Sequence, residues 1–111
     1  MDKPQLVIAA FKVKPGKSEE LKTLIEEKRK FLIENGYVTS RPNIICESFA
    51  DNNILIEVFE WVSQQKIDEV HEDKRIYEYW NKFDDLCEVV GMPLSEIPEA
   101  KIPFGTFHAI N

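Results

Sequence analysis

The chain has little of several features that would point directly to a function. Its two cysteines, Cys46 and Cys87, lie far apart without a CxxC or metal-type spacing, so the sequence favours neither a disulfide framework nor a thiolate metal site. Its four glycines stand singly, which argues against a phosphate-binding loop for ATP or a dinucleotide. The sequence also lacks a GxSxG-type motif that would present a catalytic serine.

Basic residues are scarce as well. The chain has 14 Lys and Arg against 20 Asp and Glu, and this net charge of −6 repels phosphate backbones and anionic lipid headgroups. We therefore expect neither nucleic acid nor a membrane as a partner. The first residues lack the basic start and long apolar stretch of a signal peptide, and no segment is apolar over the length of a membrane span. These features, with reduced thiols, predict a cytoplasmic protein.

The length and the apolar content fit one domain, residues 1–111. The chain is 43% hydrophobic, which is enough for a single compact core. Apolar, β-branched runs bounded by turn residues predict strands at 6–13, 43–49, 54–62 and 105–110. One predicted helix is capped by Ser18 and stopped by Asn35-Gly36; a second helical region begins at Ser63, restarts at Asp73 and is stopped at 91–93. The tail at 95–104 reads as an extended connection.

This order predicts an α+β fold of the ferredoxin-like βαββαβ type, with two helical regions packed on one face of a four-stranded antiparallel sheet. Both faces of the sheet are apolar. On the first strand, Leu6, Ile8 and Ala10 alternate with Val7, Ala9 and Phe11. On the strand 54–62, Ile54, Ile56 and Val58 alternate with Leu55, Phe59 and Trp61. Because the helices can cover only one face, we expect the other face to be buried in a two-fold homodimer.

Three stretches carry a resemblance to a known family. FKVKPGKSEEL, then RPNIICESFADNNILIEVFEWVS, then YEYWNKF after His71 resemble the antibiotic biosynthesis monooxygenase-type family of dimeric α/β barrels, over roughly residues 5–90. The resemblance implies that two subunits pair sheet to sheet into a barrel with the helices outside. It also implies cofactor-independent oxygenation of a small phenolic or anthrone-like molecule, or oxidation of a quinol.

One branch of that family degrades haem, and the resemblance to it is incomplete. That branch has a tryptophan at the position of Trp61, an asparagine on the first strand and a histidine ligand late in the second helical region. This chain has Ala10 in place of the asparagine and Tyr79 or Trp80 in place of the histidine. We therefore expect no haem and no other cofactor.

The candidate site lies where the strand 54–62 meets the helix that follows it. Trp61 ends the strand and His71 lies near the end of the helix, so we expect a cleft between helices and sheet with Trp61 on its wall and His71 at its rim. The resemblance makes Trp61 and His71 the candidate catalytic residues. The candidate ligand-binding residues are Tyr77, Tyr79, Trp80, Asn81 and His108.

Each candidate has a structural alternative. Trp61 can be a core aromatic, and His71 can bond a neighbouring carboxylate instead of exchanging a proton with a substrate. His71, Glu72 and Asp73 are consecutive and point in different directions on a helix, so we expect no metal site there. Glu47 and Glu57 lie within apolar strands, where each is either a buried base or half of an ion pair. The alternative to the enzyme is a non-catalytic dimer that binds a small ligand, or a stress-related α/β barrel protein.

Overall fold

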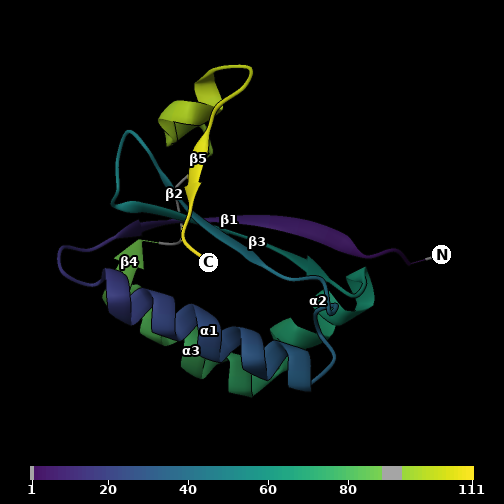
Figure 1. Cartoon of the computed structure of the whole chain (residues 1–111). Coiled ribbons are helices and arrows are strands. Elements are labelled where there is room, and N and C mark those ends of the chain that lie inside the picture. Colours follow the sequence, from purple (N-terminus) through teal and green to yellow (C-terminus); the bar gives the residue numbers. More distant parts are fainter. Residues whose placement is uncertain (1, 89–93) are drawn as a thin grey trace.

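The computed structural model describes residues 2–88 and 94–111 and has an antiparallel sheet with its main helices on one face (Figure 1). The strands are β1 (Gln5–Val13), β2 (Ile44–Ser48), β3 (Ile54–Trp61), β4 (Cys87–Glu88) and β5 (Phe107–Ala109). The helices are α1 (Ser18–Glu34), α2 (Gln64–Glu72) and α3 (Lys74–Leu86), with short 3-10 turns η1 (Leu94–Glu96) and η2 (Pro98–Lys101) in the tail. The chain is therefore an α+β protein, as the sequence predicts.

The sheet has the strand order β4-β1-β3-β2-β5, with every neighbouring pair antiparallel. The prediction of four strands is wrong, because the described residues alone form five. The place beside β1 is taken by Cys87 and Glu88, which the sequence assigned to a helix, and the last strand pairs instead with β2. β4 and β5 are placed by hydrogen bonding to the strands β1 and β2, and the apolar pattern of the sequence does not reveal these pairings.

The helix ends follow local capping chemistry. The Ser63 hydroxyl accepts a hydrogen bond from the Lys66 amide at the start of α2, and the Asp73 carboxylate accepts one from the Arg75 amide at the start of α3. Gly36 takes a φ of +72° after α1, as expected at a helix stop. The prediction of a Ser18 cap is wrong, because Lys17 holds that position without a side-chain bond.

The end of α3 also differs from the prediction. The helix stops at Leu86, before the predicted stop at 91–93, and those three positions lie outside the described residues. No helix in the described ranges is long and apolar enough to cross a membrane.

The tail forms two helical turns, not the predicted extended connection, and lies on the face of the sheet away from α1 and α3 (Figure 1). Ile97, which is 1% exposed, packs with four residues of this second face: Ala10, Cys46, Ile54 and Ile56. The tail therefore covers only one end of that face. Leu6, Ile8 and Ile44, farther along the same face, are more than half exposed.

A buried carboxylate fastens the tail to the turn between β2 and β3. Glu99 accepts hydrogen bonds from the Ser48 hydroxyl and from the backbone amides of Phe49 and Ala50. Burial raises the pKa of Glu99, but these hydrogen bonds together outweigh that effect and hold the pKa below its ordinary value of 4.5. The backbone at Gly105 approaches the Glu99 carbonyl oxygen so closely that a Cβ there would lie 2.1 Å from it, so this position requires glycine.

Replacing Glu99 by Ala should release the tail from the sheet. The three donors lose their acceptor, so hydrogen exchange should speed up at the amides of Phe49, Ala50 and the tail. In the unmodified protein, a lowered pKa means that the carboxylate stabilises the tail above pH 4.5 and loses this effect as the pH falls through the folded-state pKa. Glu96→Ala is the matched control, because Glu96 is an exposed glutamate of the same tail. Unchanged exchange in the Glu99 variant would contradict the role.

Candidate functional site

An apolar cleft of about 360 Å³ lies between the helices and the sheet. The residues that line it come from β1, β3 and all three helices: Val7, Ala9, Phe11, Lys28, Leu32, Phe59, Trp61, His71, Trp80, Phe83 and Asp84. Its volume lies within the range of roughly 300–1,000 Å³ found for small-molecule sites. The cleft is where the sequence predicts one, with Trp61 and His71 both on its lining.

Trp61 reaches the cleft because it ends β3 on the helix-facing side. Residues 59 and 61 share this face by the two-residue period of a strand, and the Phe59 and Trp61 rings meet edge to face at 5.1 Å between centroids. Trp61 is half-buried, so one part of the indole packs in the core and another part faces the cleft. The structural and the ligand-contact alternatives are both compatible with this position.

His71 and Trp80 form the wall opposite the sheet. Their rings lie 5.3 Å apart between centroids, and His71 Nδ1 lies 2.6 Å from the Ile67 carbonyl oxygen. A carbonyl can only accept, so Nδ1 carries the proton, and in the neutral ring Nε2 is left as the acceptor. Tyr77 donates its hydroxyl hydrogen to the His71 carbonyl oxygen and packs edge-on against Trp80. This arrangement leaves an exposed imidazole that can accept a proton at the rim.

Of the predicted ligand-binding residues, only Trp80 is on the cleft lining; Tyr77, Tyr79, Asn81 and His108 are not. Tyr79 stacks on Phe31 at 5.3 Å between ring centroids, in the contact between α3 and α1. Asn81 is exposed on α3, and His108 lies on β5, where its ring is 5.8 Å from that of Phe49. The cleft lining therefore does not bring Tyr79, Asn81 and His108 together with Trp61, and a role for these three in ligand binding stays a prediction.

A buried lysine that the sequence pattern did not single out lies in the cleft. Lys28 is 7% exposed, and its ammonium lies 3.2 Å from Glu57 Oε1. Glu57 is 1% exposed, and its other oxygen accepts a hydrogen bond of 3.1 Å from the Asn43 side-chain amide. Of the two interpretations of Glu57, the ion pair is the one found. The signal that could have found Lys28 was the spacing of Leu21, Ile25, Lys28 and Leu32 along one helix face, with a lysine in an apolar stripe.

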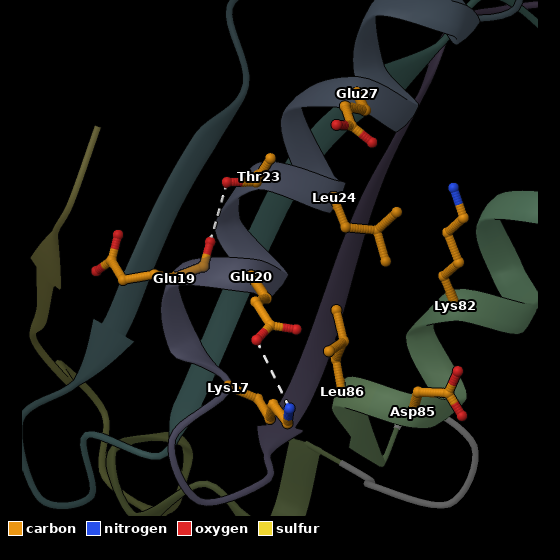
Figure 2. Close-up of a pocket in the computed structure, with 9 residues that line it drawn as sticks. All are labelled: Lys17, Glu19, Glu20, Thr23, Leu24, Glu27, Lys82, Asp85 and Leu86. Atoms are coloured by element: carbon orange, nitrogen blue, oxygen red, sulfur yellow. Dashed lines mark hydrogen bonds and ion pairs between the residues drawn. The ribbon is translucent and has the colours of Figure 1, made fainter.

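A second, larger hollow of about 530 Å³ separates the first turns of α1 from the last turns of α3 (Figure 2). Its lining is mostly charged: Lys17, Glu19, Glu20, Glu27, Lys82 and Asp85 surround Thr23, Leu24 and Leu86. Lys17 and Glu20 pair with each other at 3.6 Å, as the dashed line in Figure 2 shows. The lining of this groove has no aromatic or imidazole side chain, so it lacks the residue types that the sequence analysis singled out.

Metal and thiol chemistry find little support in the described part of the chain. No group of three His, Cys, Asp or Glu side chains there is placed to hold a metal ion. Cys46 and Cys87 are unpaired and buried. Burial raises the pKa of both thiols, that of Cys87 to about 11, so neither is a thiolate near neutral pH.

Comparison of the chain with protein-family models, curated proteins and solved structures finds no match. The resemblance carried by the three sequence stretches therefore supports a proposed function and does not assign the chain to a family.

Proposed function

We propose that the protein oxidises a small, electron-rich aromatic molecule with dioxygen, without a cofactor, in the cleft beside Trp61. The observation that carries this proposal is the composition of the cleft. Both tryptophans of the chain, Trp61 and Trp80, line a mostly apolar cavity whose lining also includes a single imidazole, that of His71. Aromatic walls suit a flat apolar ring, and the imidazole supplies the one proton acceptor that such an oxidation requires.

Two reactions fit this site. A quinol that gives two electrons and two protons to dioxygen yields a quinone and hydrogen peroxide. An anthrone whose methylene group becomes a carbonyl takes one oxygen atom from dioxygen, and the other oxygen leaves as water. In both, loss of a proton from the substrate makes the ring a better electron donor. His71 Nε2, the free acceptor of the ring, is the group assigned to take that proton.

The proposal includes a ferredoxin-like subunit that pairs with a second copy into a dimeric α/β barrel. The exposed apolar residues on the sheet face away from the helices support this assembly: Leu6, Ile8 and Ile44. Sheet-to-sheet contact would bury them and leave the helices outside. Reduced cysteines favour a cytoplasmic location for the dimer.

The alternative from a different class is a non-catalytic dimer that binds a small apolar ligand. The same cleft supports it, because His71 is exposed and its Nδ1 proton already bonds a backbone carbonyl. The two functions differ in turnover. Oxygen uptake with a panel of quinols and anthrones should rise above the rate without protein, and His71→Gln should lower it. Binding of the panel without oxygen uptake would favour the ligand-binding alternative.

Replacing Trp61 by Phe should keep the fold and weaken the binding of a flat aromatic ligand. One aromatic contact contributes about 1 kcal/mol, so affinity measured by titration calorimetry should fall by roughly fivefold. Phe104→Leu is the control, because Phe104 lies on the tail and is 92% exposed. If Trp61→Phe lowers stability but leaves binding and turnover unchanged, Trp61 is a packing residue and the oxidase proposal loses its main support.

A further inference from the structure

The least expected feature of the cleft is a charged amine inside an apolar cavity. The Lys28 ammonium lies 5.0 Å from the centre of the Phe59 ring and 5.2 Å from that of Phe83. Removing a lysine and its carboxylate partner from water is costly, and a hydrophobic pair of the same size often stabilises a fold as well or better. The ion pair therefore calls for an explanation beyond stability.

The ammonium lies close to two rings of the cleft lining, those of Phe59 and Phe83. Lys28 is among the residues that line the cavity, and neither Glu57 nor Asn43 is. An ammonium has three N–H donors, and the bond to Glu57 uses one of them. Within the described residues, the ammonium makes no other hydrogen bond, and aromatic faces meet it on two sides. Donor capacity is therefore left for an oxygen atom of a bound molecule.

We infer that Lys28 binds a neutral, hydrogen-bond-accepting oxygen on the ring of the aromatic ligand, such as a phenol hydroxyl or a quinone carbonyl. This inference rests on the proposed function and names the substrate feature that the cleft recognises. The ring occupies the apolar part of the cavity beside Trp61 and Trp80, and its oxygen takes an N–H of Lys28. Lys28 thus fixes the orientation of the ring relative to His71.

Charge balance decides between a neutral oxygen and a carboxylate. Glu57 already neutralises Lys28 at 3.2 Å, so a second full negative charge would be buried without a cation of its own. Asp84 is a carboxylate on the cleft lining itself, and it also repels an anion. A neutral acceptor gains the hydrogen bond without this cost. The cleft should therefore prefer hydroxyaromatics and quinones to aromatic acids.

Three probes with the same ring system test the preference: 2-naphthol, naphthalene and 2-naphthoate. They carry a neutral oxygen, no oxygen and a carboxylate, respectively. Trp61 and Trp80 are the only tryptophans in the chain, so the two indole N–H signals in a nitrogen–proton correlation spectrum report occupancy of the cleft. In the unmodified protein, 2-naphthol should bind roughly tenfold more tightly than either other probe. Equal binding of the three, tightest binding of 2-naphthoate, or no binding would overturn the inference.

The variants separate the role of the amine from that of the fold. Lys28→Met keeps the length of the side chain but strands a buried Glu57 carboxylate, so it is combined with Glu57→Gln, which removes both charges. The double variant should lose the tenfold preference for 2-naphthol and bind naphthalene as before. Glu57→Gln alone keeps the ammonium without its counter-charge, so 2-naphthoate should gain about tenfold. Lys30→Met, on an exposed lysine of the same helix, should change nothing.

A double variant that folds and still prefers 2-naphthol would overturn the assignment of Lys28. Oxygen uptake separates this test from the proposed function. Probes that show the expected preference, with no turnover of any quinol or anthrone, support the Lys28 assignment and contradict the oxidase. Turnover of a quinol or anthrone without a preference for 2-naphthol would support the oxidase and contradict the Lys28 assignment.

Discussion

Replacing Leu55 by Asp should unfold the protein. Leu55 on β3 is 0% exposed and lies in the helix-side cluster with Phe11, Ile25 and Phe83. The variant would lose the packing of a leucine, worth about 2–5 kcal/mol, and would bury a carboxylate without a partner. The sum is a large part of the roughly 5–15 kcal/mol that keeps a domain folded. Circular dichroism should therefore show no cooperative thermal transition.

Leu55→Met is the matched control for this substitution. Methionine has nearly the volume of leucine, so it should cost less than about 1.5 kcal/mol and leave the transition in place. A folded Leu55→Asp variant with the unmodified midpoint would mean that the helices do not cover this face of the sheet.

The alternation of residues along the strands predicts the two faces of the sheet but does not by itself say which face the helices cover. Alternation along the strands separates Leu55 and Phe59 from Ile54 and Ile56, but both sets are apolar and either could face a helix. The choice depends on the crossover of α1 and α3 over the sheet, which is a property of the whole chain. In the structure, α1 and α3 cover the face of Leu55 and Phe59.

The strand that the sequence did not predict, β4, shows a second limit of the sequence pattern. Cys87 continues the apolar spacing of α3 and therefore reads as helix, yet Cys87 and Glu88 pair with Val13 and Lys12 at the edge of the sheet. A two-residue strand has no period of its own. Its formation depends on an open edge of β1, which is set by tertiary structure.

The part of the site that could be predicted is the part whose residues lie on consecutive elements of the chain. Trp61 and His71 come together because a strand end and the helix after it are close in space whatever the rest of the chain does. Tyr79 and Asn81 do not join Trp80, because neighbours on a helix point about 100° apart. Lys28 was missed because lysine is almost always at the surface, and its burial depends on Glu57 from another element.

Replacing Ile8 by Asp should split the proposed homodimer and leave the subunit folded. Ile8 is 54% exposed in the single chain and pairs across the sheet with Val58, on the face away from the helices. A carboxylate is well solvated there in the monomer, but it would be buried unpaired between two sheets. We expect the unmodified protein to bury more than roughly 1,200 Å² in its dimer, and such an interface does not tolerate one unpaired carboxylate from each subunit.

Light scattering at micromolar concentration measures the effect. The unmodified chain of 12.9 kDa should give twice that mass, and the Ile8→Asp variant should give the mass of one chain. Ile33→Asp is the matched control, since Ile33 is 46% exposed on α1, in the helical layer that the barrel leaves outside. A monomeric mass for the unmodified protein would contradict the proposed homodimer. A dimer that survives Ile8→Asp but not Ile33→Asp would place the contact on the helices, because only the face that is buried between subunits should respond to the added charge.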